Sequence, residues 1–264
     1  MLKFSPCIEM MYRSLPFAER FAAVKAAGLD CAEFWGWTHR DLDELKEASQ
    51  KNAVKITSIC VGSKDEALAE EYGQKALLSR DSGEVLARVV EESLKTAEFL
   101  DVPALIITTG QEREDISREK QHEYVVNSLR RVAPLFESAG ITAVLEPLNI
   151  LCDHKGYFLY SGYEAFEIIR EVDSENVRLL YDIYHQQITE GNLIPNIRAN
   201  IELIGHFHVA DNPGRNEPGT GEINYRNVFK AIEQTGYKGY IGLEYSPTID
   251  DTTALKNTVA LAQS

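Results

Sequence analysis

Short apolar segments alternate with longer amphipathic ones along the whole chain, and this alternation constrains the fold more than any other feature. Eight apolar segments have the length and composition of β-strands that are buried on both faces, as parallel strands are. They span residues 2–8, 31–35, 54–61, 104–108, 141–146, 177–182, 203–210 and 240–244. Longer segments with helical periodicity separate them, so the sequence predicts a repeated βα unit.

One of the expected helices has clear signals at both ends. Its apolar residues recur at spacings of four, three and four, which places them along one helix face: Val125, Leu129, Val132 and Phe136. Ser117 can cap the helix at its start, and Gly140 stands where a left-handed residue would end it. The preceding helix is expected to have a similar stripe, made of Leu86, Val89, Val90, Leu94 and Ala97.

The number and length of the units predict a (β/α)₈ barrel, the TIM barrel, formed by residues 1–264 as a single domain. Eight units in 264 residues are about 33 residues each, which matches a barrel of roughly 250 residues. A doubly wound open sheet has the same alternation and is the alternative. No Gly-x-Gly-x-x-Gly motif follows the first strand, which disfavours that alternative.

The charge balance argues against partners that are themselves anionic. The chain has 27 Lys and Arg residues against 41 Asp and Glu residues, a formal net charge of −14. Phosphate backbones and anionic lipid surfaces would repel such a protein, so we expect neither a nucleic-acid nor a membrane partner. No apolar run approaches the roughly 18–20 residues of a membrane span. We expect a cytoplasmic protein with a small-molecule substrate, and the sequence leaves open whether it forms a homo-oligomer.

Four residues that can bind a metal stand at or near the ends of four successive expected strands: Glu146, Asp182, His208 and Glu244. In a barrel these ends meet at one rim, where active sites lie. A single acidic residue there is more often a helix cap or a solvated charge. Three carboxylates crowded at one mouth repel each other, however, and a cation would relieve that repulsion. Three carboxylates and one imidazole suit Mn²⁺, Mg²⁺ or Co²⁺.

Other polar and aromatic residues are expected near the same rim. His185 follows Asp182 by three residues, and Arg215 lies in the Gly- and Pro-rich loop after the His208 strand. His206 shares a strand face with His208 and is expected to be a packed or supporting residue. Trp35 and Trp37 follow the second strand, and we expect Trp37 to be the more exposed of the two. The remaining histidines, His39, His122 and His154, are expected to be ordinary surface residues.

Several of these segments together resemble the hydroxypyruvate isomerase family. They are Leu145-Glu-Pro-Leu-Asn149, Tyr181-Asp-Ile-Tyr-His185, most of residues 205–225, and Gly242-Leu-Glu-Tyr245. That family belongs to the xylose-isomerase-like barrels, together with the ketose 3-epimerases. The resemblance implies a divalent metal held by Glu146, Asp182, His208 and Glu244. It also implies that Glu146 and Glu244 act as an acid/base pair, and that His185 and Arg215 bind substrate oxygens.

The chain departs from the isomerase pattern in three places. The isomerases tend to have Gln at the position of His208, whereas the 3-epimerases have His. An acidic residue is usual at the position of Cys152, and Asp153 stands beside it. A Lys is common at the position of Ser246.

Three functions therefore remain open. The first is an isomerase of hydroxypyruvate or another short sugar or keto acid of three to six carbons. The second is a ketose 3-epimerase. The third is an endonuclease of the same superfamily or a non-catalytic binding protein. The net charge disfavours the endonuclease, and the four complete ligand positions disfavour the binding protein.

Overall fold

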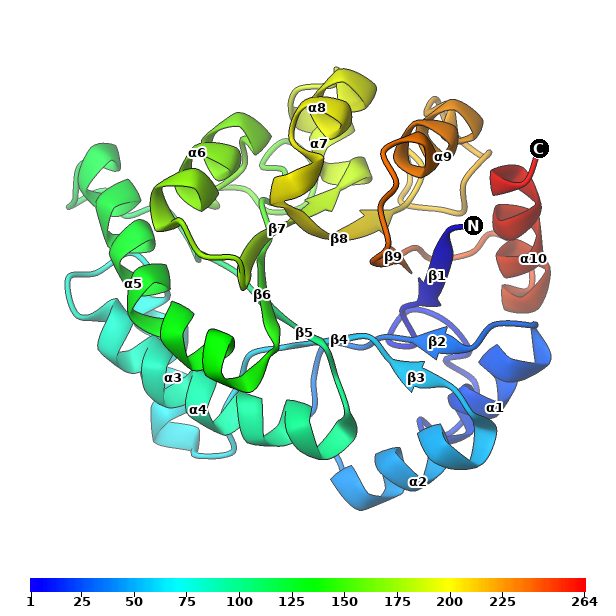
Figure 1. Cartoon of the computed structure of the whole chain (residues 1–264), viewed down its shortest axis with the longest axis horizontal. Helices are drawn as coiled ribbons and strands as arrows, with labels where there is room; N and C mark the ends of the chain where they lie inside the picture. Colours follow the sequence, from blue (N-terminus) through cyan, green and yellow to red (C-terminus); the bar gives the residue numbers. More distant parts are fainter.

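A computed structural model describes all 264 residues and shows a curled, all-parallel sheet surrounded by helices (Figure 1). The strands are β1 (Lys3–Pro6), β2 (Cys31–Ala32), β3 (Lys55–Ile56), β4 (Ser58–Cys60), β5 (Ala104–Ile107), β6 (Thr142–Leu145), β7 (Val177–Asp182), β8 (Ile204–Val209) and β9 (Tyr240–Leu243). Seven of them pair in the order β1-β9-β8-β7-β6-β5-β4, and β2 pairs with β3. The first and last strands of the chain are thus neighbours, as closure of a barrel requires.

The expected strand 54–61 is divided at Thr57 into β3 and β4, which pair with different neighbours. β3 pairs with β2, and β4 pairs with β5. An isolated parallel bridge between Cys7 and Glu33 links the end of β1 to the end of β2 and continues the ring. Each of the eight predicted strands therefore has a counterpart, and the predicted TIM barrel is confirmed. The alternative prediction of an open doubly wound sheet is wrong. In an open sheet the first and last strands would not close a ring, whereas here β1 pairs with β9.

Ten α-helices cover the outside of the sheet (Figure 1). They are α1 (Glu19–Ala26), α2 (Leu42–Asn52), α3 (Glu66–Lys75), α4 (Ser82–Leu100), α5 (Arg118–Ala139), α6 (Gly162–Val172), α7 (Ile183–Thr189), α8 (Leu193–Ala199), α9 (Tyr225–Gln234) and α10 (Asp251–Ala262). The predicted ends of α5 are confirmed: the Ser117 side chain caps its first turn, and Gly140 follows it with φ of 65°. No helix is both long and apolar enough to cross a membrane.

The alternation of side chains along the strands separates two apolar regions. The large core of 63 buried residues packs the outer faces of the strands against the helices, with Leu145, Tyr181 and Phe207 among them. A small cluster inside the barrel consists of Ala104, Ile106, Val144 and Leu180. Because side chains alternate between the faces of a strand, residues two positions further on also face inward. Those residues include Glu146 after Val144 and Asp182 after Leu180, so the strand period itself directs the acidic side chains into the barrel mouth.

Gly242 in β9 makes room for two of the polar side chains inside the barrel. A Cβ atom at this position would lie 2.2 Å from the Glu33 carboxylate oxygen Oε1 and 2.4 Å from Cδ2 of the His208 ring. Both neighbours are buried, with exposed fractions of 2% and 1%. The close approach of β9 to these side chains therefore requires glycine.

Replacing Gly242 by Ala should lower the free energy of unfolding by roughly 1–3 kcal/mol, because an extra methyl group must displace buried side chains. Gly73 in α3 is a matched control, since a Cβ there would have no atom within 4 Å. Gly73→Ala should stabilise the protein by at most about 1 kcal/mol, the difference in helix propensity. Urea unfolding of both variants measures the two effects, and equal stability of both would contradict the packing argument.

Candidate active site

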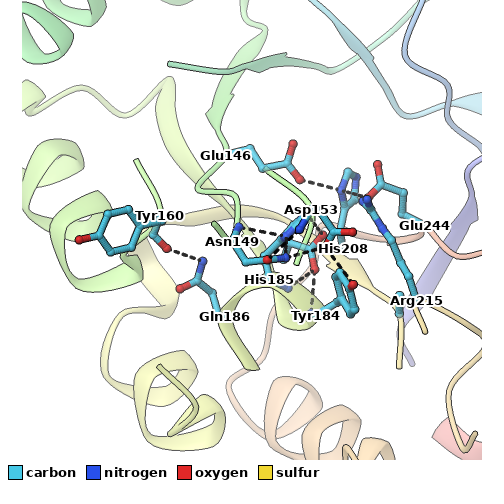
Figure 2. A network of polar contacts seen from close by, with 12 residues as sticks. Glu146, Asn149, Asp153, Tyr160, Tyr184, His185, Gln186, His208, Arg215 and Glu244 are labelled. Atoms are coloured by element: carbon cyan, nitrogen blue, oxygen red, sulfur yellow. Dashed lines mark hydrogen bonds and ion pairs between the residues drawn. The ribbon is translucent and has the colours of Figure 1, made fainter. Parts of the chain in front are cut away.

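Four adjacent strands bring Glu146, Asp182, His208 and Glu244 together at the carboxyl-terminal mouth of the barrel. Figure 2 shows Glu146, His208 and Glu244 of this group. One ligand atom of each residue lies within 4.8 Å of those of the others. All four are buried, and Glu146 is the most exposed at 6%. We call these four residues the quartet.

The His208 ring is the centre of the quartet. Its Nδ1 lies 3.1 Å from Oε1 of Glu146 and 3.5 Å from Oε2 of Glu244. The two glutamates therefore approach the same ring nitrogen from the ends of β6 and β9, two strands that are separated by β7 and β8. Asp182 has a second structural role, because its Oδ1 accepts hydrogen bonds from the backbone N–H groups of Tyr184 and His185 and caps α7.

Glu244 is held by contacts on both of its oxygens. The Trp35 indole N–H donates to Oε1 at 2.8 Å, and the Arg215 guanidinium donates to Oε2. Burial opposes ionisation of Glu244, but the charges of His208 and Arg215 outweigh it and hold its pKa below the usual range. Glu244 is therefore a fixed carboxylate.

Asp182 lies in the opposite electrostatic situation. Burial and the negative charge of Glu244 raise its pKa from the ordinary value to about 6. At pH 7 Asp182 is therefore ionised, although burial and the charge of Glu244 make this form unfavourable. No group of the protein fully offsets this cost. This penalty, together with the donor set of three carboxylates and one imidazole, fits a hard or borderline divalent cation.

Glu33 completes the polar interior below the quartet and was missed by the sequence analysis. Its Oε1 lies 3.0 Å from Nε2 of His208, and its Oε2 lies 2.9 Å from Nε2 of His206. Burial opposes its ionisation, but the two histidines lower its pKa to about 2. An acidic residue within an otherwise apolar strand segment was the signal that could have identified it. His206, expected as a packed or supporting residue, lies in that position.

His185 is fully buried in the first turn of α7, with its Nε2 3.6 Å from Oδ2 of Asp182. Burial and the nearby charge of Arg215 lower its pKa to about 4, so the ring is neutral at pH 7. Asn149 contacts its other ring nitrogen and was also missed, although it belongs to the Leu145–Asn149 segment. Cys152 is exposed, and the neighbouring Asp153 accepts hydrogen bonds from Asn149 and Tyr184.

The prediction for the two tryptophans is wrong. Trp37 is the buried one, with an exposed fraction of 1%, because its indole N–H donates to the carbonyl oxygen of Cys60 at 3.0 Å. Trp35 is 38% exposed and lies against Glu244. Trp35 is thus the aromatic residue of the mouth.

Of the histidines expected on the surface, one lies near the site instead. The His154 ring centroid is 5.4 Å from that of His185. His39 is exposed, as expected. His122 is partly buried between Glu164 and Glu171 on the outer helices.

A cavity of about 620 Å³ lies between α4 and α5 on the outside of the barrel, where Arg80, Lys120 and Arg131 line it. Cavity size therefore does not identify the functional site. The convergence of buried ionisable groups marks the quartet as the candidate site.

Comparisons with known proteins agree with this fold. Residues 21–262 match the family model of the xylose isomerase-like TIM barrel. The chain is 32% identical to hydroxypyruvate isomerase of Escherichia coli (strain K12) over 256 residues, covering 97% of this chain and 98% of the relative. It is 31% identical to 2-oxo-tetronate isomerase of Haemophilus influenzae, covering 97% of each. A crystal structure of an AP endonuclease, family 2, from Brucella melitensis superimposes with a TM-score of 0.89 at 28% identity, covering 98% of this chain and 99% of the other.

A parallel eight-stranded barrel with buried carboxylates and histidines at the carboxyl ends of its strands is the architecture of a barrel enzyme. The chain belongs to the xylose isomerase-like TIM barrel family. Its curated relatives include isomerases, which confirms the predicted resemblance to hydroxypyruvate isomerases.

Replacing Asp182 by Asn should stabilise the metal-free protein, and more so at pH 7 than at pH 5. The pKa of Asp182 in the folded state is about 6, above the ~3.9 of an unfolded aspartate, so the folded state binds this proton more tightly. Ionisation therefore destabilises the parent as the pH rises through 6, whereas Asn stays neutral and can still cap α7. The stability difference should grow by about 1 kcal/mol between pH 5 and pH 7.

Urea unfolding in the presence of a chelator measures this difference. Mn²⁺ should then raise the melting temperature of the parent more than that of the variant, because the ion offsets the buried charge. A stability difference that is the same at both pH values would contradict the unfavourable ionisation that we assign to Asp182.

Proposed function

We propose that the protein is a divalent-metal-dependent isomerase of a short 2-keto acid that has a hydroxyl group next to its carbonyl, with hydroxypyruvate as the leading candidate. The observation that carries this proposal is the pair Glu146 and Glu244, which both approach Nδ1 of His208 within 3.5 Å, together with Arg215, which contacts Glu244. The names of the curated relatives, hydroxypyruvate isomerase and 2-oxo-tetronate isomerase, support the same substrate class.

The quartet would hold the metal, with Glu146, Asp182 and Glu244 as oxygen ligands and His208 as the nitrogen ligand through Nδ1. A bound divalent ion supplies polarisation of the substrate carbonyl, which makes the adjacent C–H bond more acidic. The fit rests on the donor set and on the raised pKa of Asp182, described above.

The reaction needs a base that removes a proton and an acid that returns one at the next carbon. We assign Glu244 as the base, because its surroundings keep it ionised. It removes the proton from the carbon that has the hydroxyl group, and the electron pair forms the C=C bond of an enediolate. Glu146, in its carboxylic-acid form, donates a proton to the former carbonyl carbon, while the hydroxyl proton moves to the other oxygen, so that the ketone becomes an aldehyde. Transfer of the proton from Glu244 to Glu146 through the solvent then restores both groups.

Arg215 suits a substrate with a carboxylate. Its guanidinium is planar and can grip a carboxylate through two parallel hydrogen bonds. One of its donors, the Nε–H, is buried without an acceptor, while Nη2 contacts Glu244. An unpaired donor at the mouth is a site for an additional oxygen, and His185 would bind a second substrate oxygen.

A ketose 3-epimerase is the second candidate, favoured by His208, since the resembling 3-epimerases have His at this position. It would use the same two glutamates on a neutral sugar. An endonuclease is disfavoured by the net charge of −14, although one similar structure is an AP endonuclease.

The metal-loaded protein should convert hydroxypyruvate faster than it epimerises any tetrulose, pentulose or ketohexose. Incubation with each substrate and identification of the products by NMR provides the test. A chelator should abolish the activity, and Mn²⁺, Co²⁺ or Mg²⁺ should restore it. Faster epimerisation of a free ketose than isomerisation of any keto acid would make the 3-epimerase the correct function.

Glu146→Gln and Glu244→Gln should each reduce kcat by about 10²–10⁴-fold, because each variant keeps the side-chain shape but removes the basic carboxylate. In D₂O the parent should incorporate deuterium at the reacting carbon. Glu217→Gln is the matched control: Glu217 is 4% exposed and accepts hydrogen bonds from Thr248 outside the quartet. Full turnover by both quartet variants would show that another group moves the proton.

A further inference from the structure

The two nitrogens of the buried His185 ring have very different surroundings. Nδ1 faces two N–H donors of the same residue: the backbone N–H of Asn149 at 3.2 Å and its side-chain Nδ2 at 2.7 Å. Nε2 has no hydrogen-bond partner, and Oδ2 of Asp182 lies 3.6 Å away. One side of the ring is thus saturated by Asn149, and the other faces the quartet (Figure 2).

The orientation of the Asn149 amide is determined by its other contacts. Oδ1 accepts from the backbone N–H groups of Cys152 at 2.9 Å and Asp153 at 3.3 Å. Nδ2 donates its second hydrogen to Oδ2 of Asp153 at 2.7 Å. Rotating the amide by 180° would place the NH₂ group against two backbone donors and the oxygen against a carboxylate. The side chain is fully buried, so water cannot compensate for such a rotation.

This arrangement settles where the proton of His185 resides. A nitrogen that accepts from two N–H groups cannot also carry a hydrogen, so Nδ1 is the acceptor and the proton is on Nε2. The tautomer follows from the contacts of Asn149 alone. The free Nε2–H is buried and is directed toward the quartet.

We propose that Asn149 is a positioning residue that locks His185 as the neutral Nε2–H tautomer, so that His185 donates a hydrogen bond to a substrate oxygen. This inference rests on the proposed function, because the acceptor is the oxygen that gains charge in the enediolate. A donor that is fixed before the substrate binds stabilises this charge without reorganising during the reaction. The ring keeps its proton, since accepting another at Nδ1 would break the contacts with Asn149.

Asp153 and Tyr184 brace this arrangement from the outside. Oδ2 of Asp153 accepts the Asn149 amide and also the Tyr184 hydroxyl, the latter at 2.9 Å. Asp153, the acidic residue next to Cys152, therefore helps to fix the orientation of the Asn149 amide. This gives a structural role to the segment where the chain departs from the isomerase pattern.

The first test reads the tautomer directly in the wild-type protein. Long-range ¹H–¹⁵N NMR spectra at pH 7, of the metal-free and the Mg²⁺-loaded protein, distinguish the two neutral tautomers and the charged ring. His185→Gln identifies the signals among the six histidines. We expect protonated Nε2 and unprotonated Nδ1 in both states. A proton on Nδ1, in a neutral or a charged ring, would overturn the proposal.

The second test replaces the side-chain donor that faces Nδ1 of His185 by an acceptor. In Asn149→Asp combined with Asp153→Asn, the hydrogen bond between positions 149 and 153 can still form. A carboxylate oxygen replaces the closer of the two donors to Nδ1, and only the longer contact with the backbone N–H remains. The NMR signals should shift to a ring protonated at Nδ1. The kcat for the keto acid should fall by about 10²-fold, as for loss of one oxyanion donor, with a smaller change in KM.

Asn196→Asp is the matched control, because Asn196 is a buried asparagine of α8 whose Nδ2 has no partner. It should change neither the His185 spectrum nor kcat. An exchanged pair with an unaltered spectrum, or with a reversed tautomer and full kcat, would contradict the proposal. A wild-type protein that has the expected spectrum but no isomerase activity would instead contradict the proposed function and leave the Asn149–His185 arrangement intact.

Discussion

The burial of several negative charges around one imidazole is the constraint on which the rest of the site depends. Nδ1 of His208 lies 3.1 Å from Glu146, and Nε2 lies 3.0 Å from Glu33. The pKa of His208 is raised well above its ordinary value: burial opposes the charge, but Glu244 and Glu33 outweigh it. Without a positive partner, each of these buried carboxylates would cost several kcal/mol in lost hydration. The His208 ring thus contacts Glu33 in the interior of the barrel and Glu146 at its mouth.

Much of the site could be predicted because it follows from local rules. Parallel strands deliver the residues at their carboxyl ends to one rim, and inward-facing residues are two apart. These rules place Glu146 and Asp182 correctly from the sequence alone. They also predict that His206 and His208 lie on the same face of their strand, and in the structure the two rings are close together.

The remainder depends on contacts between distant segments, which no local pattern encodes. Glu33 becomes part of the site because β9 has Gly242 where a side chain would otherwise exclude its carboxylate. The order of the two tryptophans depends on which indole finds an acceptor: Cys60 for Trp37 and Glu244 for Trp35. Likewise, the division of one expected strand at Thr57 reflects its change of partner from β2 to β5. Residue type and spacing contain little information about such choices.

The two positively charged groups of the mouth have different roles with respect to a metal and a substrate. His208 is enclosed by carboxylates on both sides, so in the metal-free protein its positive charge balances theirs, and a metal bound at Nδ1 would take the place of that proton. Arg215 contacts only one quartet member, Glu244, and its Nε–H has no acceptor. A divalent ion on the quartet would compete with Arg215 for Glu244, because both are attracted to the same oxygen. The guanidinium then needs another anion, and the carboxylate of a keto acid supplies one of matching geometry. Metal and acidic substrate would therefore favour each other's binding, which a neutral ketose could not do.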